Sequence, residues 1–400
     1  MALIQINRDV SDPTGTLQPG ELWLNLTNGR LWGGTSGGNA LLLDPTGGTG
    51  PFLPLVGGTI TGPLVLPGNA TAPLQAMPLQ QLDTAQHNIG RNLLHNPLFN
   101  VAQRGVGPFT TLLAYTLDRW LLNGTTDTVS IGSFPLTDAD RAQIGDEAAS
   151  FCLQNGFTGS AAPAAANNLV QRIENSRRLA GKTVTVSFWA KAVSGTPKLG
   201  VNMTQNFGTG GSPSPSVNAL ATGYVAQLSN VWTRFSTTIA IPSASGKTFG
   251  TNNDSQTGVQ FWFSSGANSA AQAGNIGVQS GTVQLWGVQL EIGSVATPLE
   301  KPDPRYDLAN CQRFYRASNI PLQIGFNSWG AGAFQFFPMY HPVSMRATPT
   351  IVIGSQSGLT NVSSANVNIN QPDGFLLQAI ATTTGGASAT YAGFTASADL

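Results

Sequence analysis

The chain has 400 residues, of which 41% are hydrophobic, and this length predicts two or three domains with real hydrophobic cores. Only 10% of the residues are Asp, Glu, Lys or Arg, against about 25% in an ordinary soluble domain. Nineteen basic and 19 acidic residues give a formal net charge of zero, which argues against a dedicated nucleic-acid-binding protein. No apolar run approaches the roughly 18 residues of a membrane-spanning helix, and the first residues lack the pattern of a secretory signal.

Cys152 and Cys311 are the only cysteines, and they lie far apart in the sequence. Two cysteines without a CxxC pair make neither a disulfide scaffold nor a zinc site. We expect both to be free thiols.

Residues 1–56 contain a predicted β-hairpin. Its strands are Glu21–Leu26 and Arg30–Gly33, and Asn28-Gly29 joins them, a pair that suits a type I′ turn because both residues accept positive φ. Such a small hairpin is not stable alone. With the Gly-rich run from Gly33 to Gly50, we expect this segment to order against other copies of itself or against a larger particle.

Residues 57–90 open with GGTITGPLVLPGNATAPLQAMPLQQLD, which ends at Asp83. This stretch resembles the GG-x-[MI]-TG-x-L-x-L-x-G-x-P…A-x-x-x-Q-x-[VL]-D element of bacteriophage tail fibre and related fibre proteins. The matching residues are Gly57, Gly58, Ile60, Thr61, Gly62, Leu64, Leu66, Gly68, Gln81, Leu82 and Asp83. Pro78 departs from the pattern, so we expect a helix only over Leu79–His87. The resemblance implies a trimerising neck, and therefore a homotrimer.

Residues 91–302 form the largest predicted unit, and Lys182–Lys191 is its clearest strand. One face carries Val184, Val186, Phe188 and Ala190, and the other carries Thr185, Ser187, Trp189 and Lys191. This alternation predicts a strand with one face in a core and one wetter face. Further short strands, separated by Gly, Pro, Asn and Ser, and a single helical candidate near Asp138–Ala149 indicate a β-sandwich in which this strand is an inner one.

The same region resembles the jelly-roll, carbohydrate-binding-module-like domain of phage tail proteins. The matching residues are Asn96, Phe99, Gln103, Arg104 and Gly105 at the start, Asp118, Arg119 and Trp120 in a D-R-W triplet, and Gln289, Leu290 and Glu291 in the closing strand. The resemblance covers about half of the chain and implies a jelly-roll domain.

Residues 303–400 form a predicted C-terminal β-rich domain with one helix. Pro302-Asp303-Pro304 is the expected boundary, since two prolines disfavour helix and strand alike. Leu308, Cys311 and Tyr315 stand at helical spacing and predict a helix over Tyr306–Arg316. The segments Leu308–Tyr315 and Met345–Thr350 resemble the terminal domain of the same fibre proteins. We therefore expect a mainly β chain with an N-terminal hairpin, a short neck, a jelly-roll sandwich and this last domain, assembled as an elongated homotrimer.

Catalytic motifs are missing from the sequence, which has three histidines in unrelated contexts and no HExxH, GxSxG or P-loop pattern. Paired acids could serve a glycosidase, and the candidate pairs are Asp138 with Asp140, Asp146 with Glu147, and Glu291 with Glu300. The first four residues fit better as the solvated face of a short segment. Glu291 fits better as a structural partner of Arg119 or of a backbone amide. We expect no enzyme activity.

Metal and cofactor sites are not predicted, with one alternative left open. Jelly-roll sugar-binding modules often hold a structural calcium ion with oxygen ligands. At the family positions this chain has Asn100 and Gln284 to Gln289, which are neutral rather than acidic.

Three tryptophans lie on the more polar faces of predicted strands. Trp189 shares a face with Ser187 and Lys191, Trp232 with Arg234, and Trp262 with Gln260. Aromatic rings among short polar groups suit sugars, because the rings stack on C–H faces while amides and hydroxyls bind the edges. The candidate carbohydrate-binding residues are Trp189, Trp232, Trp262, Arg234 and Gln260. The alternative for each tryptophan is packing in a core, which is the more common role in a β-sandwich.

The three resemblances occur in the order that a phage fibre or spike subunit has. They imply a virion protein of the tail or capsid, made in the bacterial cytoplasm and exposed outside the particle, whose N-terminal segment attaches to other virion proteins. The expected function is adhesion to a host surface glycan, with several weak sites acting together. A purely structural fibre and a polysaccharide depolymerase are the two alternatives. We expect neither nucleic acid nor a membrane as a partner.

Overall fold

The structure, a computed structural model, describes residues 6–43, 90–218, 220 and 223–400. The chain divides into two compact units, Met1–Asp83 and Thr84–Leu400. Apart from Gly90, the predicted neck of residues 57–90, with its helix over Leu79–His87, lies outside the described residues. In the described ranges, no helix has the length and apolar character needed to cross a membrane.

The N-terminal unit contains a four-stranded sheet in the order β1-β2-β3-β4. Its strands are β1 (Ile6–Asp9), β2 (Leu22–Asn25), β3 (Leu31–Thr35) and β4 (Gly38–Leu43). The predicted hairpin is confirmed, because β2 and β3 pair antiparallel. The predicted type I′ turn is wrong, because Gly29 has a φ of 72° but Asn28 has no positive φ, and the Asn25 N–H donates to the Arg30 carbonyl across a longer loop. Within the Gly-rich run, residues 38–43 form β4, which pairs with β3.

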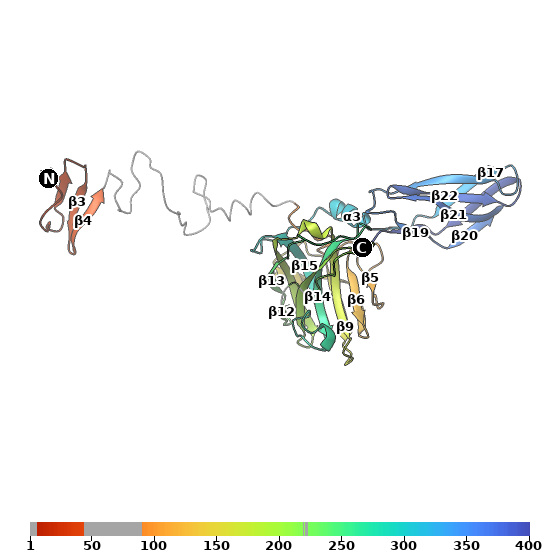
Figure 1. Ribbon diagram of the computed structural model, residues 1–400, viewed down its shortest axis with the longest axis horizontal. Coiled ribbons are helices and arrows are strands. Elements are labelled where there is room, and N and C mark those ends of the chain that lie inside the picture. Colours follow the sequence, from red (N-terminus) through yellow and green to blue (C-terminus); the bar gives the residue numbers. More distant parts are fainter. Residues whose placement is uncertain (1–5, 44–89, 219, 221–222) are drawn as a thin grey trace. The chain divides into compact units, whose positions relative to one another are not determined.

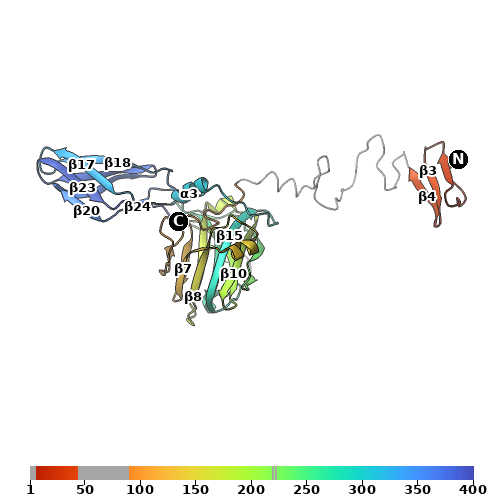
Figure 2. The same cartoon turned by 180° about the vertical axis from the view of Figure 1, so that it is seen from behind.

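The sandwich consists of two antiparallel sheets that pack face to face (Figures 1 and 2). The five-stranded sheet runs in the order β13 (Thr233–Ala240), β10 (Thr183–Ser194), β15 (Ser280–Ile292), β8 (Phe151–Thr158) and β7 (Thr128–Pro135). The six-stranded sheet runs in the order β12 (Tyr224–Gln227), β11 (Lys198–Asn206), β14 (Gln256–Ser265), β9 (Ala166–Glu174), β6 (Leu121–Thr125) and β5 (Ala114–Tyr115). The predicted β-sandwich is confirmed.

Strand β10 has the predicted apolar face, but its other face is only partly wet, because Thr185 and Ser187 are buried, with exposed fractions of 1% and 0%. Val184, Val186 and Phe188 are fully buried in the core between the two sheets, while Trp189 and Lys191 point away from that core and are partly exposed. Because β10 lies between β13 and β15, it is an inner strand, as its apolar face predicts.

Short helices connect the strands of the sandwich. The predicted helical segment contains α2 (Asp138–Ile144), which begins at a capping box formed by Thr137 and Asp140 and ends at Gly145 in the left-handed region. Two single 3-10 turns, η1 (Ser176–Arg178) and η2 (Ala267–Ser269), follow β9 and β14.

The C-terminal domain begins with α3 (Pro304–Gln312), whose N-cap is Asp303. The predicted helix over Tyr306–Arg316 is wrong in its last turn, because Tyr315 and Arg316 belong to a strand that pairs with Ser397 and Ala396. Three three-stranded sheets follow. They are β16 (Tyr315–Ser318), β24 (Phe394–Ser397) and β19 (Thr350–Ile353); β17 (Leu322–Ser328), β23 (Gly385–Tyr391) and β20 (Gln356–Thr360); and β18 (Phe334–Tyr340), β22 (Gly374–Ala381) and β21 (Val362–Gln371).

Two large hydrophobic cores, and two smaller clusters on the sandwich, hold the described elements together. The sandwich core is built from residues between Leu93 and Leu290, and the C-terminal core from residues between Leu322 and Ala398. Cys152 and Cys311 are free and buried, as predicted from their spacing.

Candidate functional site

Trp232 and Trp262 are buried, with exposed fractions of 4% and 3%. Trp262 packs against Ala273 and Ile276, which belong to the segment that follows η2 and covers the outer face of the six-stranded sheet. The Trp232 indole donates a hydrogen bond of 2.8 Å to Asp140 of α2. Core packing, the alternative weighed for each tryptophan, is therefore what the structure shows for these two residues.

Trp189 is half-buried on the outer face of the five-stranded sheet. Its ring packs edge-on against the Trp286 ring, with 5.5 Å between the two ring centres. The ring also lies over Gly287, which has a φ of 60°. A Cβ atom at Gly287 would come within 3.1 Å of the ring. The Arg234 guanidinium lies 4.8 Å from the Trp189 ring centre and donates to Ser187 and to the Thr297 carbonyl. Burial lowers the pKa of Arg234.

The five predicted carbohydrate-binding residues are not brought together. Trp189 and Arg234 pair across β10 and β13, whereas Gln260 and Trp262 lie on β14 of the other sheet. Gln260 is 8% exposed and its amide oxygen accepts the Trp262 indole N–H at 3.3 Å. The sequence could not show this, because the covering segments come from distant parts of the chain.

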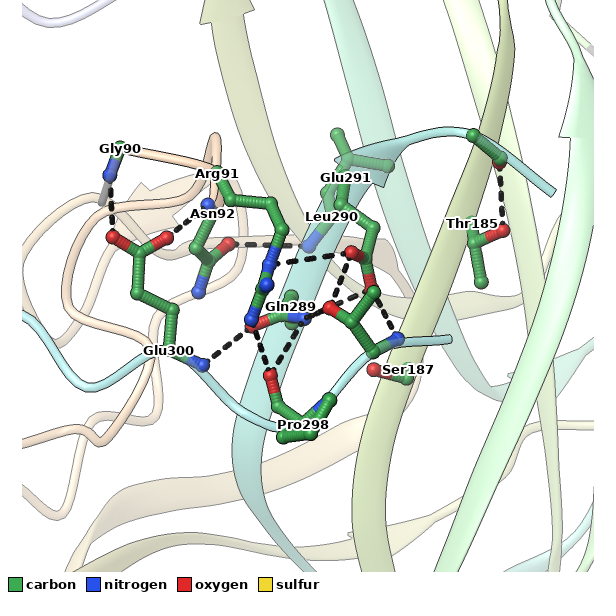
Figure 3. Close-up of polar contacts among 12 residues, drawn as sticks. Gly90, Arg91, Asn92, Thr185, Ser187, Gln289, Leu290, Glu291, Pro298 and Glu300 are labelled. Atoms are coloured by element: carbon green, nitrogen blue, oxygen red, sulfur yellow. Dashed lines mark hydrogen bonds and ion pairs between the residues drawn. The ribbon is translucent and has the colours of Figure 1, made fainter. Parts of the chain in front are cut away.

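A polar network joins the first and last residues of the sandwich (Figure 3). Arg91 lies 3.4 Å from the Glu291 carboxylate and donates to the Pro298 carbonyl at 2.6 Å. The Glu300 carboxylate accepts the backbone N–H groups of Gly90 and Asn92 at 2.5 and 2.6 Å. We call these contacts the terminal latch, since they fasten the entering chain to the leaving chain.

Glu291 is the centre of the terminal latch. Its carboxylate accepts the Thr297 backbone N–H at 2.9 Å and the Gln289 amide at 2.9 Å. The predicted backbone-amide partner is thus present. The predicted pairing with Arg119 is wrong, because the arginine beside Glu291 is Arg91. Arg91 lies outside the D-R-W triplet, and no sequence motif pointed to it.

The residues near the ends of the sandwich do not fit a calcium ion. Oxygen atoms of Glu291, Thr297 and Pro298 do converge, but the Gln289 amide nitrogen donates to all three, and the Arg91 guanidinium adds a positive charge. Asn100 is exposed, and the Gln284 amide donates to Gln154. Within the described residues, no group of three or more His, Cys, Asp or Glu side chains could hold a metal ion.

The acids near α2 have structural contacts rather than a shared site. Asp138 is exposed and pairs with Arg141, and Asp146 pairs with Lys301 at 2.7 Å. Asp140 is not on a solvated face as predicted, because it is 8% exposed and binds Lys191. Burial raises the pKa of Asp140, but hydrogen bonds from Lys191 and Thr137 outweigh burial and lower that pKa below its ordinary value.

An open groove of about 530 Å³ lies on the sheet of β17, β23 and β20. Gly325 and Asn327 of β17, Gly386 and Ser388 of β23, and Thr360 of β20 line it. The strand pairing places Gly325 beside Ser388, and Ser388 beside Thr360. Added Cβ atoms at Gly325 and Gly386 would meet no atom closer than 3.7 Å. No close neighbour requires a glycine at either position, so the missing side chains of these two glycines simply leave the groove open.

Trp329 is the most exposed aromatic side chain in the part of the chain that the structure describes, at 78%. It stands two residues beyond Asn327, and its carbonyl accepts the Thr384 hydroxyl at 3.1 Å, two residues before Gly386. The groove and Trp329 thus belong to the same end of the C-terminal strands. We call them together the groove site. The sequence signal that could have found it is the SWG turn after a strand that alternates polar and apolar residues.

No protein-family model matches the chain, and no curated protein matches it. Among solved structures, the enzymatically active domain of tailspike protein 4 from bacteriophage CBA120 is 16% identical and covers 52% of this chain, with a TM-score of 0.29. The match spans 23% of the length of that tailspike chain.

Two carbohydrate-binding modules are similar to the same extent. The family 11 module of Clostridium thermocellum, in complex with a mixed-linked tetrasaccharide, is 10% identical over 48% of this chain and 95% of its own, with a TM-score of 0.28. The xylan-binding module of Paenibacillus barcinonensis is 12% identical over 51% of this chain and 96% of its own, with a TM-score of 0.28. Because these scores are low, the function is inferred from the residues of this chain.

Proposed function

We propose that this chain is a subunit of a bacteriophage fibre or spike and that it attaches the particle to a glycan on the host surface. The observation that carries the proposal is the groove site, an open polar groove next to an exposed tryptophan. The order of the neck, jelly-roll and terminal motifs supports the assignment to a fibre.

The chemistry of the groove site suits a sugar. Its volume of about 530 Å³ lies within the range of small-molecule sites, about 300–1,000 Å³. Asn327, Thr360 and Ser388 offer amide and hydroxyl groups that can donate and accept hydrogen bonds. The exposed ring of Trp329 offers an apolar face for sugar C–H groups.

We further propose a homotrimer on the virion, tail or capsid, built after synthesis in the bacterial cytoplasm and exposed outside the particle. The N-terminal unit would attach it to other virion proteins, and neither nucleic acid nor a membrane would be a partner. Three copies of a weak site would bind a repetitive glycan far more tightly than one copy. A stable monomer in light scattering would contradict this arrangement.

A purely structural fibre is the second candidate. The burial of Trp232 and Trp262 favours it, because those rings give the sandwich packing rather than an exposed platform. We propose no enzyme activity and no cofactor in either case. Incubation with host polysaccharide tests this point, and shorter products would establish a depolymerase.

Binding of the purified full chain to host cells and to a glycan array tests the proposed adhesion. We expect Trp329→Ala to weaken binding about tenfold, since one aromatic contact contributes about 0.5–1.5 kcal/mol. Ser388→Gln, which fills the groove, should do the same. The controls are Tyr340→Ala, which removes an equally exposed ring, and Ser363→Gln on β21, and both should bind normally. Equal losses in the controls, or intact binding in both groove variants, would contradict the proposed site.

A further inference from the structure

A small cavity, partly open to the surface beside the exposed Arg178, lies at β9, where Phe314 packs against the sandwich. Its volume is about 20 Å³, enough for one guest of the size of a water molecule. Six polar residues line it: His95, Arg119, Gln171, Arg172, Glu174 and Arg178. The cavity is separate from the groove site and from the terminal latch.

Arg119 is buried in the wall of this cavity without full pairing. Its side chain is 2% exposed, and its guanidinium carbon lies 3.3 Å from the centre of the Phe314 ring. One terminal nitrogen donates to the Arg172 carbonyl at 2.5 Å. Among the described residues, the Nε and Nη1 groups have no hydrogen-bond partner. A buried donor without a partner destabilises the folded state, and a charged one does so more strongly. The cavity therefore needs a guest that accepts hydrogen bonds.

The charges around the cavity favour a negative guest over a neutral one. Three arginines line it, against one carboxylate, Glu174. That carboxylate is already engaged by Arg313 through contacts of 3.1 and 3.3 Å. Asp399, another acid whose charge acts on Arg119, pairs with Arg104. Arg172 donates to the Leu400 carbonyl oxygen and Arg178 is exposed, so the positive charge that a guest of this cavity would compensate is that of the buried Arg119.

His95 adds a further polar group. Its Nδ1 has no hydrogen-bond partner among the described residues. Burial, and then the charge of Arg119, lower the pKa of His95 to about 3. The ring is therefore neutral at pH 7, and it can donate one hydrogen bond without adding charge.

We propose that this cavity binds one monatomic anion, with chloride as the physiological ion. The volume excludes phosphate, sulfate and carboxylate groups, which need room for several heavy atoms. A spherical anion accepts hydrogen bonds from any direction, so it can serve Arg119 Nε, Arg119 Nη1 and His95 together. The ion would stabilise the contact between β9 and Phe314.

Bromide is the probe for the test, because it is detected by anomalous scattering. We expect crystals of the full chain grown in sodium bromide to show an anomalous peak inside the cavity. In solution, replacing sodium gluconate by sodium bromide at constant ionic strength should raise the unfolding temperature by about 2–4 °C. Gluconate is too large to enter.

Two variants separate the cavity from general salt effects. Arg119→Gln and Arg178→Gln should lose most of the bromide-dependent shift, whereas Arg305→Gln, at an exposed arginine of α3, should keep it. Arg178 is exposed, so this variant folds even if Arg119→Gln does not. The proposal would be overturned if the cavity held a water molecule and showed no anomalous peak, and if the unfolding temperatures in bromide and gluconate were equal.

Discussion

In the sandwich, Trp232 and Trp262 are almost completely buried, whereas Trp329 and Tyr340 of the C-terminal strands are 78% and 76% exposed. Both regions are antiparallel β-structure with alternating side chains. They differ in what covers their outer faces. Helix α2 and the segment after η2 cover tryptophans of the sandwich, while the sheet of β17, β23 and β20 keeps an open groove. A ring on the outer face of a strand is thus available only where no other segment folds over it.

The largest expected effect is on a covered tryptophan. Trp262→Ala should lower the free energy of unfolding by about 3–5 kcal/mol, because it leaves a cavity under Ala273 and Ile276. Chemical denaturation measures it. Tyr306→Ala, at an exposed ring of α3, is the control and should unfold like the unchanged protein. A Trp262→Ala protein of unchanged stability would mean that the ring is not part of the packing.

A similar loss is expected at the terminal latch. Glu291→Gln keeps the shape of the side chain but leaves Arg91 buried beside a neutral group, which costs about 3–5 kcal/mol. Glu147→Gln, at an exposed acid, is the matched control. Chelation with EDTA should leave the unfolding temperature unchanged, since the Arg91 guanidinium and the Gln289 amide N–H groups already bind the oxygens at this position. A loss of stability in EDTA would show that a metal ion is bound.

A smaller, pH-dependent effect is expected at the contact between the sandwich and α3. Asp307 accepts the Asn96 backbone N–H at 2.7 Å, and burial, with a lesser contribution from the Asp118 charge, raises the pKa of Asp307 to about 6. Because the folded protein holds this proton more tightly than the unfolded chain, the stabilisation is complete below about pH 4 and is lost as pH rises through 6.

Asp307→Asn tests this sign. The amide keeps an acceptor for Asn96 and carries no charge, so the variant should gain about 2 kcal/mol at pH 7. Stability measured from pH 4 to pH 7 should then fall less with rising pH than in the unchanged protein. His95 has the opposite effect on the pH dependence of stability. Because its pKa is lowered to about 3, it makes the folded protein more stable as pH rises. A variant that changes both Asp307 and His95 separates the two contributions. A variant that is less stable at pH 7 would refute the burial of a charged Asp307.

The smallest effect is expected at the exposed rings. Trp329→Ala and Tyr340→Ala should change the free energy of unfolding by less than about 0.5 kcal/mol each. Thermal unfolding measures this. A large loss in either variant would place that ring in a packed interface and would remove the contrast with Trp262.

Local signals account for the part of the fold that could be predicted. The alternation of Lys182–Lys191 and the Asn28-Gly29 pair each depend on residues that are neighbours in sequence. They predict the buried face of β10 and the presence of the hairpin, but not the burial of Thr185 and Ser187 or the turn type. Tyr315 was misplaced because its partner, Ser397, is far away in the chain, and pairing with β24 overrides helical spacing.

The site was harder to predict for the same reason. Whether Trp262 is buried depends on Ala273 and Ile276, and whether Glu291 pairs with Arg91 depends on how the ends of the sandwich meet. The groove site needs three strands from separate parts of the C-terminal domain. Apart from the SWG turn near the groove site, none of these contacts leaves a pattern in a single stretch of sequence.

The terminal latch also has a mechanical meaning. The chain enters the sandwich at Gly90 and leaves it at Glu300, and these two residues are joined by a hydrogen bond. A pull between the entering and leaving chains is therefore carried first by the contacts of Glu300, Arg91 and Pro298 and, through the Arg91–Glu291 pair, by the end of β15. The other strands of the sandwich are loaded only after these contacts break, so the sandwich can stay folded while force passes along the chain.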